Sequence, residues 1–255
     1  MRATESLENS IEHRIIDSLN ELNRPDLFRS PIIGFSSAED ERYSKLKEII
    51  GDWHLNPAEL LPDAKSVISY FVPFTKAVAM EPQTLVNGSF LWSEAYQEIN
   101  RHFDKMNQAV ADYLTKRGYS TKTIQATHTY DQKDLKSMWS HRSAAAIAGL
   151  GAFGLNRLLI TEKGSAGRFC TVITSAPLQA NIKPIENKCL YVKNGSCSLC
   201  LKICPVQALE TESFKKFDCQ DELNKNQSLM TASTPLEMAD TCGKCISVCP
   251  VAYVE

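Results

Sequence analysis

Apolar positions recur at helical spacing in two stretches of the chain. Residues 7–22 place isoleucine and leucine side chains at three- and four-residue steps among charged ones, which predicts an amphipathic helix. Residues 93–117 continue the same spacing over a longer stretch, and Gly118 follows as a helix-ending residue. The run Ser66–Phe74 is instead short, β-branched and aromatic, and it predicts a buried strand.

The second part of the body has shorter elements. Residues 119–127 have an extended pattern, and residues 139–150 are alanine-rich and predict a helix that glycines 149–154 end. Residues 157–161 and 169–174 predict the two strands of a hairpin, because a glycine-containing turn separates them. We therefore predict a mixed α/β (α+β) body.

Composition places the chain among ordinary folded proteins. Its 255 residues are 43% hydrophobic and 23% charged, which is enough for one large domain or for one ordinary domain with a small one. The longest charge-free runs are too short for a membrane helix, and the first 14 residues lack the apolar segment of an export signal. We therefore expect a cytoplasmic protein with no membrane partner.

The charge balance gives no sign of a nucleic-acid-binding protein. The formal net charge is −2, and neither part of the chain is basic. A protein that binds the phosphate backbone usually carries excess positive charge, although a local basic patch remains compatible with this balance.

Cysteine divides the chain into two parts. Eight of the nine cysteines lie between Cys189 and Cys249. A reducing cytoplasm does not maintain disulfides, so this concentration indicates metal or redox chemistry. We predict a body over residues 1–185 and a separate cysteine-rich module over residues 186–255.

The module contains an internal repeat. A Cys-x2-Cys-x3-Cys-Pro sequence begins at Cys197 and recurs at Cys242. This spacing is typical of ferredoxins with two [4Fe–4S] clusters, in which the cysteine before proline binds the other cluster. Each copy lacks its usual preceding cysteine, and Cys189 and Cys219 are the spare residues that complete two sets of four.

The crossing rule therefore predicts the ligands of each cluster. One set is Cys189, Cys197, Cys200 and Cys249, and the other is Cys204, Cys219, Cys242 and Cys245. Two structural zinc sites are the alternative, although zinc modules usually consist of paired Cys-x2-Cys motifs. The ninth cysteine, Cys170, lies in an apolar strand, and we predict a small core residue there.

The body resembles epoxyqueuosine reductases and related corrinoid iron–sulfur proteins, including reductive dehalogenases. The resemblance rests on Trp139–Gly154, on the segments around Leu158–Thr161 and Val172–Thr174, on Leu61–Ile68 upstream, and on both cysteine motifs. It implies a nitroreductase-like α/β body that holds cobalamin, followed by a ferredoxin-like module with two [4Fe–4S] clusters.

The sequence departs from this family in two respects. Leu155 replaces the lysine that follows the glycines in the family. The tRNA reductases also continue past the clusters into helical repeats, whereas this sequence ends at Glu255. We therefore expect tRNA to be an unlikely partner.

The resemblance suggests which body residues contact the cofactor. Glycine has no Cβ to obstruct a flat cofactor, although the same glycines could equally end a helix and form a turn. The predicted cofactor-binding residues are Ser140, His141, Arg142, Gly149, Gly151, Gly154 and Asn156.

Proton donation to a reduced substrate needs an acidic side chain near the cofactor. His128, Tyr130, Asp131 and Asp134 form a polar cluster before the alanine-rich helix, and a solvated loop is the alternative interpretation of this cluster. From it we predict Asp131 or Tyr130 as the proton donor, with Asp134 as a second possible counterpart of the family's aspartate.

These features predict an oxidoreductase in which two clusters relay low-potential electrons to a corrinoid, which reduces a small substrate. A low-potential donor such as ferredoxin or flavodoxin would supply the electrons. One alternative is an electron-transfer or corrinoid-reducing protein that acts on a partner protein without substrate chemistry. Another is a flavin (FMN) in place of the corrinoid, because nitroreductase-like folds commonly hold one.

Overall fold

The computed structural model of the chain describes residues 6–126, 130–181 and 185–255. A four-stranded antiparallel sheet forms its centre, with the strand order β1-β2-β8-β3. The sheet strands are β1 (Ile32–Ser37), β2 (Ser66–Pro73), β3 (Thr121–Thr123) and β8 (Gly167–Thr174). The mixed α/β prediction is confirmed.

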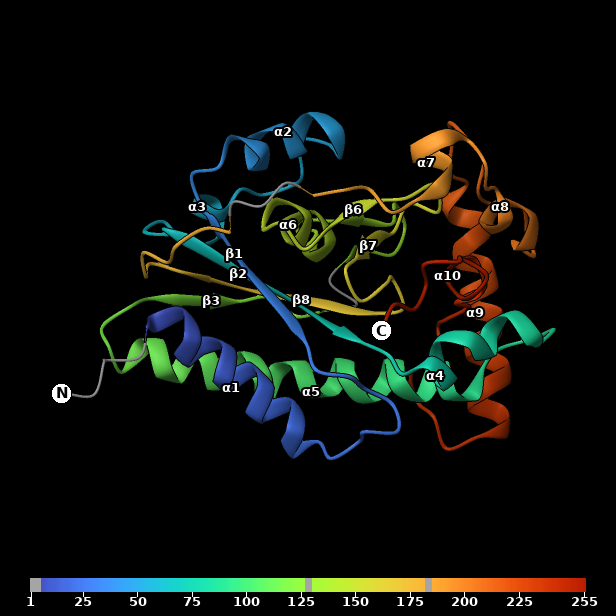
Figure 1. The fold of residues 1–255 in the computed structure, drawn as a ribbon, viewed down its shortest axis with the longest axis horizontal. Coiled ribbons are helices and arrows are strands. Elements are labelled where there is room, and N and C mark those ends of the chain that lie inside the picture. The colour runs from blue at the N-terminus through green and yellow to red at the C-terminus, as the bar shows by residue number, and fades with distance from the viewer. Residues whose placement is uncertain (1–5, 127–129, 182–184) are drawn as a thin grey trace.

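Every residue of β2 is buried. Its continuous apolar run suits a central strand with helices on both faces, and Figure 1 shows helices on either side of the sheet. On one face lie α1 (Leu7–Glu21) and α5 (Phe90–Thr115). On the other face lie α2 (Glu41–Ile49), α3 (Pro57–Leu60) and α6 (His141–Ile147).

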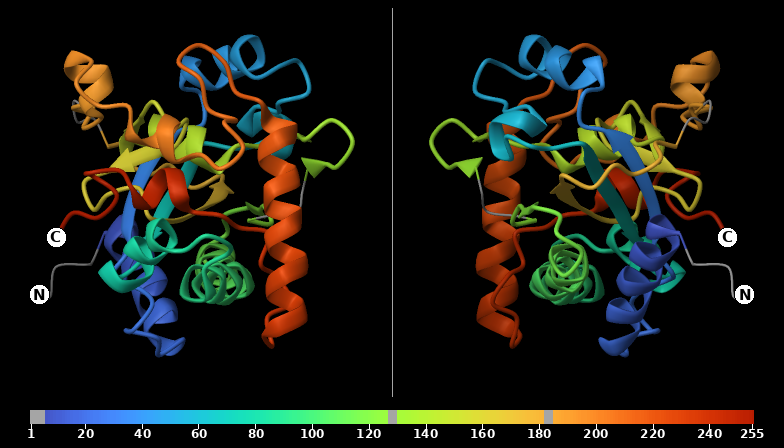
Figure 2. Two further views of the ribbon diagram at one scale, coloured as in Figure 1. Left: turned by 90° about the vertical axis from the view of Figure 1, so that its right-hand side faces the viewer. Right: turned by 90° about the vertical axis from the view of Figure 1, so that its left-hand side faces the viewer.

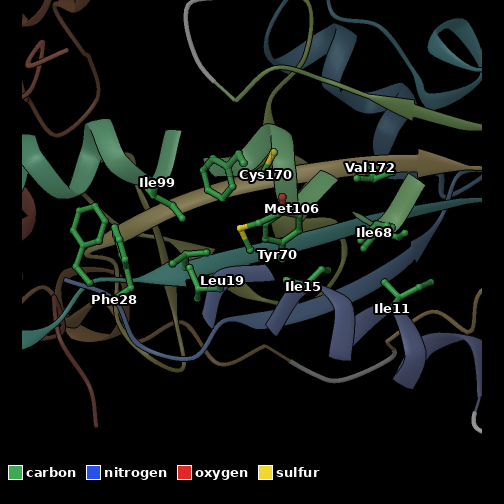
Figure 3. Packing of buried hydrophobic residues seen from close by; sticks show 14 of the residues in the cluster. Ile11, Ile15, Leu19, Phe28, Ile68, Tyr70, Ile99, Met106, Cys170 and Val172 are labelled. Carbon is green, nitrogen blue, oxygen red and sulfur yellow. The ribbon is translucent and has the colours of Figure 1, made fainter. Parts of the chain in front are cut away.

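The main core lies between the sheet and the helices α1 and α5. Ile11, Ile15 and Leu19 project from α1 toward the sheet, as the amphipathic pattern predicts (Figure 3). Tyr70 of β2 donates a hydrogen bond to Asn107 of α5 at 2.7 Å inside this core. Cys170 is fully buried beside them, so its predicted place in the core is confirmed.

The remaining short elements connect the layers and form the cysteine-rich segment. These are α4 (Lys76–Met80), η1 (Glu81–Thr84), β4 (Tyr130–Asp131), β5 (Lys136–Ser137), β6 (Gly151–Phe153), β7 (Leu159–Thr161), α7 (Leu190–Asn194), α8 (Leu199–Ile203), α9 (Lys216–Ser233) and α10 (Lys244–Ser247). They gather at one end of the sheet, where α9 lies alongside the end of α5 (Figures 1 and 2).

The predicted hairpin of residues 157–161 and 169–174 is wrong. β7 pairs with β6, whereas β8 pairs with β2 and β3. The turn between β7 and β8 carries the chain from the small β6–β7 ribbon into the main sheet. Burial of β8 between two strands decides its partners, and the local sequence pattern does not encode that choice.

The final residues of the cysteine-rich segment bind to the body. Arg29 donates hydrogen bonds to the carbonyl oxygens of Phe74, Lys163 and Val254 at 3.0, 2.7 and 2.7 Å. The guanidinium also lies over the ring of Tyr253, at 4.2 Å from its centroid. These contacts fix the backbone a few residues beyond Cys249.

Candidate iron–sulfur and cofactor site

Four cysteines surround one cavity at the edge of the body. The cavity and its opening hold about 350 Å³. Its cysteine lining consists of Cys189, Cys197, Cys200 and Cys249. These residues are the first set that the crossing rule predicts, and Cys249 comes from the second copy of the repeat. Their role as cluster ligands remains a prediction.

The pKa shifts of Cys200 and Cys249 also reflect the charges of the other cysteines in the first set. Burial raises the pKa of Cys200 to about 11, and repulsion from the thiolates of Cys249, Cys189 and Cys197 adds to this rise. Burial also raises the pKa of Cys249, with Cys189 and Cys197 as its charged neighbours. A cation bound among these sulfurs would reverse this effect, because it favours the thiolate form.

The other four cysteines form a second group. Burial raises the pKa of Cys219 to about 11, with Cys242 and Cys204 as the neighbouring thiolates. Burial also raises the pKa of Cys245, and the charges of Cys242, Cys219 and Cys204 add to this rise, followed by Cys200 of the first group. Cys204 belongs to the first copy of the repeat, so both groups exchange one cysteine between copies.

The first group is open at its centre. In the ranges that the structure describes, no three histidine, cysteine, aspartate or glutamate side chains are arranged to hold a single metal ion. The first four cysteines instead line a cavity together with the apolar residues Leu155, Ile160 and Val251. A cavity of this kind accommodates a multi-atom cluster held by four thiolates.

Backbone and side-chain donors contact both cysteine groups, two from the body and one, Ala208, from the cysteine-rich module itself. The N–H of Leu155 donates to Sγ of Cys189 at 3.5 Å, and the N–H of Ala208 donates to Sγ of Cys204 at 3.2 Å. Asn156 donates from Nδ2 to the carbonyl oxygen of Cys245 at 3.2 Å. Hydrogen bonds to sulfur are one determinant of the potential of a cluster.

Most of the predicted cofactor-binding residues have partners within the protein. Ser140 caps α6 by accepting from the N–H of Ser143 at 3.1 Å. His141 contacts the hydroxyl of Thr171 through Nδ1 at 2.8 Å and the carbonyl of Gln125 through Nε2 at 3.2 Å. Burial lowers the pKa of His141 to about 4, which fits a neutral ring that accepts from Thr171 and donates to the carbonyl.

The local structure also explains why glycine occupies each of these three positions. A Cβ on Gly151 would lie 2.3 Å from the carbonyl oxygen of Ile160 across the β6–β7 ribbon. A Cβ on Gly154 would lie 2.8 Å from the side chain of Ile160, and Gly149 has a φ of +80° after α6. Close backbone approach and the left-handed region explain these glycines without a cofactor, so their predicted cofactor contact remains a prediction.

Arg142 differs from the other predicted cofactor-binding residues. Its side chain is exposed to solvent, and no other described residue gives it a hydrogen bond or an ion pair. Surrounding protein nevertheless lowers its pKa through burial, followed by repulsion from Arg168, while Cys245 has the opposite effect. Arg142 therefore lies at an exposed position of α6, within electrostatic range of Arg168 and of Cys245 in the second cysteine group.

Of the predicted proton donors, the structure brings only Tyr130 into a pocket. Asp131 accepts from the N–H groups of Lys133 and Asp134 at 2.9 and 2.8 Å, and so caps a turn. Asp134 is exposed and pairs with Lys136 at 3.3 Å. His128, the fourth member of the sequence cluster, lies outside the described residues.

The sequence analysis missed two charged residues near Tyr130. Asp240 lines the same pocket, and Tyr96 donates to its carboxylate at 3.4 Å. Burial and the Asp240 charge raise the pKa of Tyr130. Arg168 lies over the ring of Tyr96 at 4.6 Å. Its charge also acts on Arg142. A charged residue inside an apolar strand was the only sequence signal for Arg168, and Asp240 had none.

The fold and the site together define a class of protein. It has a mixed α/β body and two groups of four cysteines. Comparison with known proteins is consistent with this class. No protein family model matches the chain. It is 26% identical over 208 residues to epoxyqueuosine reductase of Bacillus subtilis, which covers 77% of this chain and 50% of that protein. It is 31% identical over 161 residues to the Bacillus cereus enzyme, which covers 60% of this chain and 38% of that protein.

Solved structures give the same fold at lower identity. An epoxyqueuosine reductase with a tRNA-Tyr epoxyqueuosine-modified tRNA stem loop superposes with a TM-score of 0.59 at 21% identity, over 96% of this chain and 66% of that one. A catabolic reductive dehalogenase in complex with 3-bromo-4-hydroxybenzoic acid superposes with a TM-score of 0.60 at 15% identity, over 88% of this chain and 30% of that one.

The chain is therefore epoxyqueuosine reductase-like, as its motifs predict. It spans half or less of the length of the two curated relatives described above. Both groups of relatives are named for reductive reactions. Among the described residues, no helix has the length and apolarity needed to cross a bilayer.

The comparison corrects one expectation. The sequence analysis considered tRNA an unlikely partner, because the charge is balanced and the helical repeats are missing. A structural relative of this fold has been solved with a tRNA stem loop, which contradicts that expectation. The expectation drawn from overall charge and from the family's helical repeats is therefore wrong.

Proposed function

We propose that the protein is an iron–sulfur reductase whose two cysteine groups hold [4Fe–4S] clusters and whose body holds a corrinoid beside Arg142. The observation that supports this proposal most strongly is the crossed arrangement of eight cysteines. Cys249 joins the first group and Cys204 joins the second, as two linked clusters require. When bound, the clusters carry single electrons and the corrinoid cobalt performs the bond chemistry.

The chain supplies a suitable environment for both clusters. Cys189 and Cys200 are buried, and the other six cysteines of the two groups are partly buried. The N–H groups of Leu155 and Ala208 donate to the sulfurs of Cys189 and Cys204. Asn156 holds the backbone at Cys245 against the body. These contacts fix the cysteine positions before a cluster binds, so less ordering is needed on assembly.

The charge of Arg142 and Arg168 suits the polar periphery of a corrinoid. A corrinoid carries amide and phosphate groups, and the guanidinium groups of Arg142 and Arg168 can donate hydrogen bonds to their oxygens. A Cβ on Gly151 or Gly154 would meet the chain's own atoms, so these two glycines are explained by local packing, and their contact with a macrocycle stays a prediction. The residues that would hold the group are therefore the two arginines.

We propose a modified nucleoside carried in RNA as the substrate. The names of the sequence relatives and the tRNA stem loop bound by one structural relative support this class. Tyr130 would donate the proton, because its hydroxyl lines the pocket that also contains Asp240. Asp131 and Asp134 lie outside that lining, so they are second choices for this role.

The test is reduction of epoxyqueuosine-containing tRNA by the anaerobically reconstituted protein with cobalamin and a chemical reductant. Mass spectrometry of the digested tRNA should show the reduced nucleoside. Tyr130→Phe should lower the rate at least about a hundredfold, the usual share of a general acid. Tyr119→Phe is the matched control and should leave it unchanged. Absence of any reduced nucleoside with fully loaded protein would refute the proposed substrate.

A further inference from the structure

Three apolar residues form one side of the cavity that the first cysteine group lines. They are Leu190, Leu199 and Pro250, and each is a sequence neighbour of one of the cysteines. Leu190 and Leu199 are 38% and 41% exposed although they line the cavity, and Pro250 is exposed as well. We call these three residues the outer wall, because they belong both to the cavity lining and to the molecular surface.

The opposite side of the cavity is buried. Leu155, Asn156 and Ile160 line it there, and none of them is more than 6% exposed. The N–H of Leu155 also donates to Sγ of Cys189. The first cysteine group therefore has one side against the body and one side toward solvent.

The second cysteine group lies closer to the body. Asn156 donates to the carbonyl oxygen of Cys245, and the charge of Cys245 acts on Arg142. A Cβ on Gly243 would lie 2.8 Å from the ring of Trp92 on α5, so this part of the module packs tightly on the body. Figure 1 shows α8 at the end of the molecule and α10 nearer the sheet. The first group is thus the outer of the two.

Basic residues accompany the outer wall. Residues 187–209 contain no aspartate or glutamate, although the formal net charge of the chain is −2. Lys193 follows Leu190 by three positions on α7, and such a pair shares one side of a helix. Lys202 has the same spacing from Leu199 on α8. The three lysines of this segment are Lys188, Lys193 and Lys202.

These lysines differ in how far their charge is compensated. Lys193 forms an ion pair with Glu186. Lys188 donates to the carbonyl oxygen of Glu162 at 3.3 Å, a contact that leaves its positive charge in place. Lys202 is exposed, and within the described ranges no residue gives it a hydrogen bond or an ion pair. The surface around the outer wall is therefore positive.

The size and charge of this surface indicate what kind of partner it suits. A small apolar area with a charged rim is typical of an interaction site. Complexes that transfer electrons are weak and bury little area, and complementary charge speeds their formation. A matching partner has an acidic surface and a small apolar face of its own.

We propose that the outer wall and its lysines are the docking surface for a small acidic protein that carries single electrons. The proposal rests on the proposed function, since the first cysteine group must hold a cluster to receive the electron. The reduced carrier loses one electron and this cluster gains it, and no covalent bond forms or breaks. Electrons therefore enter at the first group and leave from the second, which lies nearer Arg142.

Electron transfer from a reduced, strongly acidic [2Fe–2S] ferredoxin to the reconstituted full chain tests the proposal. In stopped-flow absorbance, Lys202→Glu should lower the second-order rate constant at least about fivefold at low ionic strength, and added salt should shrink this difference. Calorimetry with the oxidised ferredoxin should show weaker binding to the variant in the same proportion.

Lys122→Glu is the matched control, because Lys122 is exposed on β3, far from α8 (Figure 1). It should behave as the wild type in both measurements. Photoreduced deazaflavin, a small-molecule reductant, should reduce the clusters of all three proteins equally, which shows that the clusters are intact.

Three outcomes would overturn the docking surface. They are no binding of the ferredoxin, equal effects of Lys202→Glu and Lys122→Glu, and a dimer of the chain that Lys202→Glu dissociates in sedimentation analysis. If Lys202→Glu fails to fold, a wild-type rate that is independent of salt would overturn it as well. Electron transfer by this surface without tRNA reduction would refute the proposed substrate alone, and tRNA reduction with unchanged ferredoxin kinetics in Lys202→Glu would refute the surface alone.

Discussion

The side-chain amide of Asn156 reaches from the body to the carbonyl oxygen of Cys245 at 3.2 Å. The same side chain accepts from the N–H of Leu158 at 3.2 Å, and only 5% of Asn156 is exposed. One buried residue therefore connects the turn after the glycine segment to the second cysteine group. The sequence analysis assigned Asn156 to cofactor contact, and the structure gives it a partner within the chain.

Replacing Asn156 with alanine should destabilise the protein. The change leaves the partly buried carbonyl of Cys245 without this donor, which costs on the order of 1 kcal/mol. Urea unfolding of the metal-free protein measures this loss. Asn20→Ala, at an exposed position of α1, should lie within about 0.5 kcal/mol of the wild type. Equal stability of the two variants would contradict the connecting role.

Gly151→Ala separates the structural from the cofactor role of the glycine segment. The added Cβ would lie 2.3 Å from the carbonyl oxygen of Ile160. We expect a loss of stability on the order of 1–3 kcal/mol, with the cobalamin affinity of the folded protein unchanged. Gly118→Asn is a suitable control, because a Cβ there meets no atom within 4 Å and asparagine tolerates its positive φ. Lost cobalamin binding at unchanged stability would favour direct contact instead.

His141 should make stability depend on pH. Its folded pKa of about 4 is below the ordinary value of 6.5, because burial disfavours the charged ring beside Arg168 and Arg142. The unfolded chain therefore binds more protons between these values, so the contribution of His141 is complete above pH 6.5 and is lost as the pH falls toward 4. Unfolding free energies of wild type and His141→Gln, measured across this window, should converge at low pH. Parallel curves would contradict this expectation.

The cysteines provide an internal comparison. Cys219→Ser should remove one of two clusters, because no other spare cysteine lies near the second group. Cys170→Ser should keep both, since Cys170 is fully buried in the core and its sulfur accepts from Asn107 at 3.3 Å. Iron content and electron paramagnetic resonance of the reduced proteins distinguish the variants. Loss of a cluster in Cys170→Ser would show that the ligand assignment is wrong.

The elements with a strong periodic pattern were predictable from the sequence. The helix predicted over 7–22 is α1, and the predicted strand Ser66–Phe74 is β2 with one residue fewer. The predicted long helix is α5, which begins earlier, at Phe90, because Ser89 caps it. Strand pairing was not predictable, since β8 joins β2 from about a hundred residues away and this choice depends on burial.

The candidate site was predictable only where chemistry constrains spacing. The cysteine repeat predicts two crossed groups, and the structure brings the same residues together. Asp240 and Arg168 become functional candidates only through their neighbours in space, which no spacing rule encodes. The expectation about tRNA is contradicted by a structural relative solved with a tRNA stem loop, because net charge describes the whole chain and not a single surface.

Iron and acid-labile sulfide analysis of the anaerobically reconstituted protein tests the central claim most directly. Two [4Fe–4S] clusters require about eight iron and eight sulfide per chain. Zinc analysis of the same preparation is the necessary companion measurement. We expect about eight of each and no bound zinc. Two zinc ions per chain with no sulfide would contradict the account.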